Sequence, residues 1–187
     1  MPPIRTVAVI GAGVMGWGIA HAAALAGYRT ILEDIVPASL RKAKTEIRAH
    51  LNKAVEQRRI EGPEADVVFS RIEYVSTVEE AARQADLVIE AVPDEMESKI
   101  EIFTLLDKVC KPGTILASNT ACMSVTEMAS VTYRASQCLG MRFFNPVESM
   151  KQLEVVRALE TDEATIAACI EVGRRMGKEV VIVEEVG

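Results

Sequence analysis

The stretch TVAVIGAGVMG, residues 6–16, joins a short apolar run to a glycine-rich turn. Residues 6–10 are β-branched or small, which is typical of a strand buried on both faces of a parallel sheet. Gly11 permits a tight turn, Gly13 permits close backbone approach to a ligand, and Gly16 permits a following helix to pack close to the strand. With a strand before it and a helical stretch after it, the pattern predicts a Rossmann-type dinucleotide-binding turn.

An acidic residue follows the second predicted strand. Asp34 lies 18 residues after Gly16, near the position where a carboxylate accepts hydrogen bonds from the adenosine ribose and repels a 2′-phosphate. We therefore expect NAD rather than NADP. The amides that begin the first helix are expected to face the cofactor phosphates. The predicted cofactor residues of this region are Gly11, Gly13, Val14, Met15, Gly16 and Asp34.

The remaining chain alternates β-branched runs with amphipathic stretches, which predicts βαβ units around a parallel sheet. Strands are expected at residues 6–10, 29–33, 71–75, 86–91, 114–118, 138–143 and 180–183. Helices are expected at residues 14–26, 37–59, 95–110, 125–130 and 162–176, and Gly62-Pro63 is expected to break the chain. The predicted fold class is α/β, with residues 1–187 forming one doubly wound, mostly parallel Rossmann-type sheet and helices on both of its faces.

Composition excludes several classes of protein. A net charge of −6 argues against nucleic acid as a partner, because phosphate backbones are bound mainly by clustered Lys and Arg. No apolar run approaches the roughly 20 residues that a membrane-spanning helix needs, and no leader precedes the first strand, so we expect a cytoplasmic protein without a membrane partner. The cysteines are widely spaced, so no metal site is expected, and all four should be buried small hydrophobes: Cys110, Cys122, Cys138 and Cys169.

Three more motifs follow the glycine turn in order. They are Ile89-Glu90-Ala91-Val92 with Lys99 on the next helix, Ser118-Asn119-Thr120, and Phe143-Phe144-Asn145-Pro146 with Met150-Lys151. Together with the turn they closely resemble the 3-hydroxyacyl-CoA dehydrogenase family, from about Thr6 to Val183. The resemblance implies an oxidoreductase of fatty-acid metabolism, such as β-oxidation or short-chain 3-hydroxybutyryl-CoA metabolism. Its reaction would be oxidation of the 3-hydroxyl of an acyl-CoA, with hydride transfer to NAD.

The resemblance also implies roles for residues around the cofactor. Met15 and Asp34 would contact its adenosine side, and Lys99 would reach it from the helix at residues 95–110. The alternative for Lys99 is a solvated lysine paired with a nearby acid. The other residues implied to lie at the cofactor form the loop beneath it or flank the nicotinamide: Val92, Pro93, Asp94, Asn119 and Asn145.

Contacts with the acyl-CoA are implied in two places. Ser118, Ala121 and Asn145 would lie at the acyl group. Lys53 and Arg58, on the long charged helix, are the best candidates to contact the CoA phosphates, because phosphate oxygens suit cationic donors. A helix with so many charges is also typical of a solvated face.

The sequence departs from the family at the catalytic centre. Arg142 stands where the family has a histidine that takes the hydroxyl proton, although the orienting glutamate persists as Glu154, and Ala121 replaces a serine. A guanidinium has five donors and no lone pair, so Arg142 cannot act as a base. Unless another base such as Glu148 substitutes, we expect severely reduced activity, with Arg142 and Glu154 forming an ion pair. His21 is expected to be packed or to flank the cofactor.

The family also has a C-terminal helical domain that closes the substrate cleft and forms the dimer interface. We expect this chain to lack that domain, to have weak or no activity by itself, and to form a homodimer only when the domain is present. Two other functions stay open. One is an NAD-dependent dehydrogenase of another hydroxy acid, with the guanidinium fork of Arg142 binding a substrate carboxylate. The other is a non-catalytic NAD-binding module.

Overall fold

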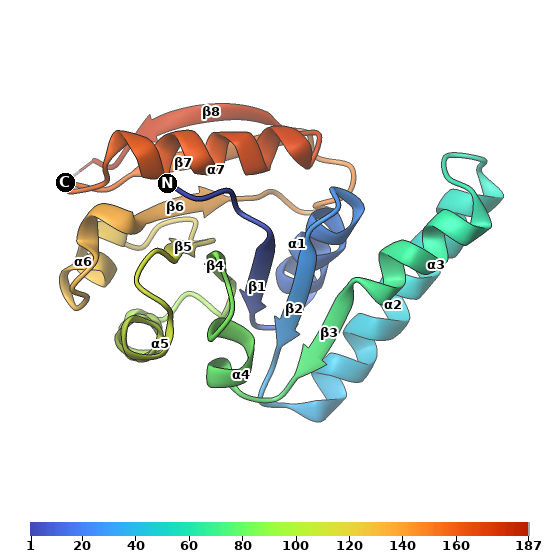
Figure 1. The fold of residues 1–187 in the computed structure, drawn as a ribbon, viewed down its shortest axis with the longest axis horizontal. Coiled ribbons are helices and arrows are strands. Elements are labelled where there is room, and N and C mark those ends of the chain that lie inside the picture. The colour runs from blue at the N-terminus through green and yellow to red at the C-terminus, as the bar shows by residue number, and fades with distance from the viewer. Residues whose placement is uncertain (187) are drawn as a thin grey trace.

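The strand β1 (Thr6–Ile10) lies inside an eight-stranded sheet in the computed structural model, which describes residues 1–186 (Figure 1). The strand order is β3-β2-β1-β4-β5-β6-β7-β8, and every neighbouring pair is parallel except β6 with β7. The other strands are β2 (Arg29–Glu33), β3 (Ile72–Val75), β4 (Leu87–Glu90), β5 (Ile115–Ser118), β6 (Cys138–Arg142), β7 (Gln152–Arg157) and β8 (Glu179–Glu184).

Helices cover both faces of the sheet, which confirms the predicted fold class. Successive residues of a strand point to opposite faces, so Val7 and Val9 join one apolar cluster while Ala8 and Ile10 join the other. The first cluster packs under α1 (Val14–Leu25), α2 (Pro37–Glu56), α3 (Gly62–Ser70) and α7 (Glu163–Arg175). The second packs under α4 (Val78–Ala82), α5 (Met96–Val109) and α6 (Val125–Ser130), and a short 3₁₀ helix (Ala135–Gln137) precedes β6.

Three elements, besides the short 3₁₀ helix, were not predicted. Gly62-Pro63 does not simply break the chain, because it begins α3, where a proline in the first turn costs no hydrogen bond. The five-residue α4 is capped by Thr77, whose hydroxyl accepts a hydrogen bond from the Glu80 amide at 3.2 Å. The six-residue β7 runs antiparallel to β6 and separates it from β8, so the last strand does not lie beside β6 as a purely parallel sheet would require.

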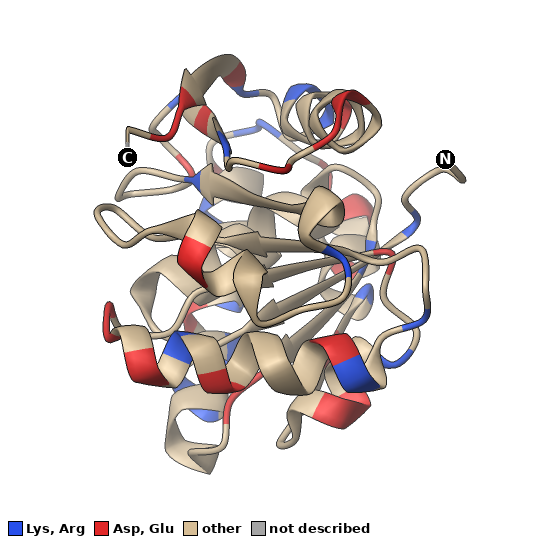
Figure 2. Cartoon of the chain, turned by 90° about the vertical axis from the view of Figure 1, so that its left-hand side faces the viewer, with Lys and Arg blue, Asp and Glu red and all other residues tan. Residues whose placement is uncertain are grey.

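Charged residues lie mainly on the helices and connecting segments, while the central strands are largely uncharged (Figure 2). Across residues 1–186 no helix is both long and apolar enough to cross a membrane. The same residues contain no group of three His, Cys, Asp or Glu side chains that could hold a metal ion. Three cysteines are buried as predicted, but the prediction was wrong for Cys122, which is exposed in the loop after β5.

Candidate functional site

A cleft of about 860 Å³ opens at the carboxyl ends of the parallel strands. In an open α/β sheet this edge is where ligands bind, because the loops after neighbouring strands diverge there. The cleft collects residues from five separate parts of the chain that the sequence had assigned to the site. Those lining residues are Gly11, Gly13, Val14, Met15, Asp34, Val92, Pro93, Asp94, Asn119, Ala121, Arg142 and Asn145.

The glycines of the first turn have different environments. Gly11 has a φ of 99°, in the left-handed region that favours glycine. A Cβ on Gly16 would lie 1.7 Å from the Gly11 carbonyl oxygen, so Gly16 permits the start of α1 to pack on the turn. A Cβ on Gly13 would meet no atom within 4 Å, and Gly13 lines the cleft. Gly16 is therefore required for packing, and Gly13 keeps space open for a ligand.

The first turn of α1 is suited to an anion. No side chain caps its N-terminus, and no acidic residue lies in its first turn. The first amides of a helix have no intrahelical acceptor, and the helix dipole adds a partial positive charge at that end. Since Gly13 and Val14 line the cleft at this point, a phosphate group bound there would meet free N–H donors.

Asp34 is held at the cleft by the backbone. One carboxylate oxygen accepts from the Ala12 amide at 2.9 Å and the other from the Val36 amide at 2.8 Å. A carboxylate has about four acceptor positions, so two remain for a ligand hydroxyl. The sequence did not identify Ile35 and Val36, which are 81% and 48% exposed and line the cleft beside Asp34. The signal available in the sequence was a pair of apolar residues directly after the acidic residue.

Glu33, the neighbour of Asp34, is buried at the end of β2. Burial, with a smaller contribution from the charge of Asp34, raises the pKa of Glu33 to about 7. The folded protein therefore keeps this proton between pH 4.5 and 7, where the unfolded chain loses it. Folding becomes less favourable as pH rises through this window, and the loss is complete above pH 7.

Replacing Glu33 with glutamine is expected to remove this pH dependence. Glu33→Gln should gain stability over the unaltered chain as pH rises from 4.5 to 7, and the difference should stay constant above pH 7. Urea unfolding at pH 5 and pH 8 measures it, with Glu101→Gln on the exposed face of α5 as the matched control. A Glu33→Gln effect that is equal at the two pH values would contradict the burial argument.

Arg142 and Glu154 face each other across two strands. The antiparallel register pairs them directly, and their side chains form the expected ion pair. Arg142 also donates to the Ala121 carbonyl oxygen at 3.1 Å, and its guanidinium lies 5.3 Å from the centre of the Phe144 ring. Arg142 lines the cleft, whereas Glu154 lies behind it with a side chain only 13% exposed. Arg142 is therefore the member of the pair that a ligand in the cleft would meet, together with Asn145.

Residues 6–186 match the family described as "3-hydroxyacyl-CoA dehydrogenase, NAD binding domain". The chain belongs to this family.

Relatives of this NAD-binding domain are metabolic enzymes. It is 40% identical to the probable 3-hydroxybutyryl-CoA dehydrogenase of Bacillus subtilis (strain 168), over 97% of the chain and 63% of that protein. It is 36% identical to the mitochondrial hydroxyacyl-coenzyme A dehydrogenase of Sus scrofa, over 94% of the chain and 57% of that protein. The chain thus spans about three fifths of the length of these relatives.

Solved structures agree with this assignment. The crystal structure of the (S)-3-hydroxybutyryl-CoA dehydrogenase from Ralstonia eutropha has a TM-score of 0.94 and 33% identity. The match covers 98% of the chain and 64% of that structure. The 3-hydroxybutyryl-CoA dehydrogenase from Escherichia coli has a TM-score of 0.95 and 35% identity, covering 98% of the chain and 39% of that structure.

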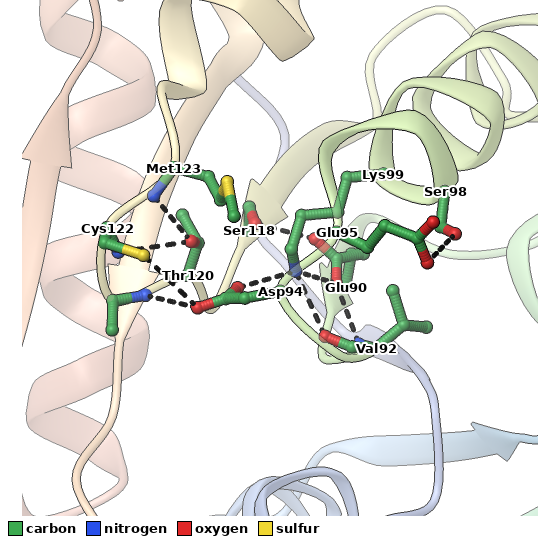
Figure 3. Close-up of polar contacts among 11 residues, drawn as sticks. Glu90, Val92, Asp94, Glu95, Ser98, Lys99, Ser118, Thr120, Cys122 and Met123 are labelled. Carbon is green, nitrogen blue, oxygen red and sulfur yellow. Dashed lines mark hydrogen bonds and ion pairs between the residues drawn. The ribbon is translucent and has the colours of Figure 1, made fainter.

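Two residues predicted to contact ligands are buried in this NAD-binding domain. Lys99 is 0% exposed and does not line the cleft, so both a direct cofactor contact and a solvated surface position are wrong for this structure (Figure 3). The pairing with a nearby acid is present, because its ammonium group binds the buried Glu90 at 2.7 Å. Ser118 is also 0% exposed and donates to Glu90 at 2.6 Å, which rules out the expected substrate contact in this conformation.

Four further candidates lie outside the cleft. Lys53 and Arg58 are exposed near the end of α2, so their contact with CoA remains a prediction. Glu148 is not positioned as a substitute base, because its carboxylate faces His50 at 3.1 Å beside a separate pocket. His21 is packed in the core near His50, and burial lowers its pKa to about 4.

Proposed function

We propose that this chain is the cofactor domain of an enzyme that transfers hydride between NAD and the C3 hydroxyl of a 3-hydroxyacyl-CoA in fatty-acid metabolism. The observation that carries the proposal is the cleft, where the free amides of α1 and the carboxylate of Asp34 lie on one lining surface. Family membership supports the same assignment. The acyl-CoA part concerns the whole protein, because the relatives are longer than this chain.

The cleft residues suit separate parts of the cofactor. Gly13 and Val14 would hold the pyrophosphate, and Met15 and Asp34 would lie at the adenosine side, where Asp34 would accept from the ribose. The loop of Val92, Pro93 and Asp94 would lie beneath the cofactor, with Asn119 and Asn145 toward the nicotinamide end. Asn119 is held there because its side-chain oxygen accepts from the Phe143 amide at 2.8 Å. When bound, NAD supplies the hydride acceptor.

Among the described residues, the cleft offers only a weak proton acceptor for the substrate hydroxyl. Arg142 has no lone pair to offer. Asp94 lines the cleft, but hydrogen bonding from Thr120 and the charge of Lys99 outweigh the effect of its burial and lower its pKa. A carboxylate with a lowered pKa is a weak base at neutral pH. We therefore expect slow turnover in the protein as it stands.

Arg142 does not favour a substrate carboxylate. Its charge is already paired with Glu154, and Ala121 uses another of its donors. A substrate carboxylate would have to compete with the partly buried Glu154 for the same guanidinium. Arg142 therefore gives no support to a dehydrogenase of another hydroxy acid.

Cofactor choice tests the function of Asp34. The unaltered chain is expected to bind NADH at least about tenfold more tightly than NADPH, because the carboxylate repels a 2′-phosphate. Asp34→Ser should reduce this preference about tenfold, measured by NADH and NADPH fluorescence titration at a temperature where both proteins are folded. The exposed Glu101→Ser serves as the control. Equal affinity of the unaltered chain for both cofactors would refute the assignment.

Activity tests the substrate class. The whole protein, mixed with NADH and acetoacetyl-CoA, is expected to oxidise NADH measurably but slowly. Its rate should be about 10²-fold or more below the rate that a positioned acid–base group would permit. Absorbance at the NADH maximum follows the reaction. Tight NADH binding without any oxidation at high enzyme concentration would instead indicate a non-catalytic NAD-binding module.

A further inference from the structure

Glu90 is a charged residue at the end of a strand whose other residues are all apolar. It is 0% exposed and ends β4, just before the loop that lines the cleft. Figure 3 shows its carboxylate at the centre of a group of polar contacts. One oxygen accepts from the Ser118 hydroxyl at 2.6 Å, and the other accepts from the Val92 amide at 2.8 Å and the Lys99 ammonium at 2.7 Å.

Lys99 extends these contacts into the cleft loop. Besides Glu90, its ammonium donates to the Val92 carbonyl oxygen at 3.1 Å and pairs with Asp94 at 3.3 Å. An ammonium has three N–H donors, so all three have acceptors. The Asp94 carboxylate then accepts from the Ala121 amide at 3.4 Å. The chain of contacts therefore joins the loop after β4 to the loop after β5, and both loops line the cleft.

Stability alone does not account for this arrangement. A buried ion pair usually stabilises a fold no better than apolar residues of similar volume, because both charges lose their hydration. The neighbouring apolar cluster already joins β4, α5 and β5 through Val88, Phe103 and Leu116. What apolar packing cannot do is bind the peptide groups of an irregular loop. Here the buried pair binds both the amide and the carbonyl of Val92.

We propose that Glu90 is a positioning residue for the cofactor. It acts through Lys99 and the Val92 peptide groups. These contacts hold the loop of Val92, Pro93 and Asp94 in the position in which it lines the cleft and would lie beneath bound NAD. The inference rests on the proposed function, since it assumes that the cleft holds NAD. It also gives Lys99 a role that needs no direct contact with the cofactor.

The test separates cofactor binding from stability. Glu90→Gln keeps the shape of the side chain. The double variant Glu90→Gln with Lys99→Met removes both buried charges together, so that Asp94, whose side chain is 34% exposed, is the charge in this group that loses its partner. The double variant is expected to change the melting temperature by less than about 5 °C. Its dissociation constant for NADH should rise about tenfold, because the Val92 carbonyl and Asp94 lose their donor. NADH fluorescence titration and thermal unfolding provide the two readouts.

Two matched variants complete the experiment. Glu101→Gln with Lys108→Met makes the same change at exposed positions of α5 and should leave both readouts unchanged. Ser118→Ala removes one contact of Glu90 but leaves those to Val92, so NADH affinity should stay within about twofold. An equal loss of affinity in Ser118→Ala would show that the hold on Val92 is not the cause, and would overturn the proposal.

The remaining outcomes are also decisive. Unchanged NADH affinity in the folded double variant would overturn the positioning role while leaving the proposed function intact. If neither Glu90→Gln nor the double variant folded, the contacts of Glu90 and Lys99 would be required for stability. That result would also overturn the positioning role. Absence of NADH binding by the unaltered chain would refute the cofactor assignment, and the inference with it.

Discussion

Replacement of Gly16 by alanine is expected to destabilise the domain by about 3 kcal/mol or more, at the upper end of the effects of overpacking. The added Cβ would lie 1.7 Å from the carbonyl oxygen of Gly11, which is a backbone atom of a tight turn. Relief therefore requires α1 or the turn to move, and α1 packs across the central strands of the sheet. Urea unfolding followed by circular dichroism measures the loss.

Gly13→Ala is the matched control for this prediction. A Cβ at Gly13 meets no atom within 4 Å, and its φ of −68° suits alanine. The free energy of unfolding should therefore change by less than about 1 kcal/mol, the usual range for an N-cap substitution. The same Cβ would project into the cleft and weaken NADH binding. If Gly16→Ala unfolded at the same urea concentration as Gly13→Ala, the packing argument would be wrong.

Restoring a base at position 142 is expected to give the largest change in activity. In the whole protein, Arg142→His should raise the rate of acetoacetyl-CoA reduction by NADH about 10²–10⁴-fold, the usual contribution of a positioned acid–base group. The strand register supports this, because residue 142 lies directly opposite Glu154, and the carboxylate could orient an imidazole. Steady-state kcat at neutral pH is the measurement.

Arg142→Gln provides the comparison, since it removes the same positive charge without adding a base. Its kcat should stay near that of the unaltered protein, and a rate as high as that of Arg142→His would show that loss of the arginine, and not gain of a base, caused the increase. No increase in Arg142→His, in a protein that still binds NADH, would count against the account of the catalytic centre.

Local sequence patterns predicted most of the fold. Residues 6–10, 29–33 and 86–91 were recognised as strands because each centres on a short run of β-branched and apolar residues, which is typical of a strand covered on both faces. The missed elements have different causes. α4 has only five residues, too few to show a helical period. β7 is longer than several of the predicted strands, but its sequence QLEVVR mixes polar with apolar residues and follows an irregular loop.

The sequence by itself determined which chemical groups reach the cleft. A parallel sheet brings the carboxyl ends of its strands to one edge, so the turn at Gly11, the acid Asp34 and the loop at Asn119 meet there whatever the packing details. The absence of a base at Arg142 also follows from the sequence alone, because no environment gives a guanidinium a lone pair.

Only the tertiary structure decided which polar side chains face the ligand. Lys99 and Ser118 lie in motifs next to the cleft, yet both are buried with Glu90, and Glu148 faces His50 instead of the cleft. The spacing of the motifs in the sequence specifies which strand end a residue lies near. The partner that the side chain reaches depends on groups brought together from distant segments, because a buried charge must find an opposite charge or a donor wherever the fold provides one.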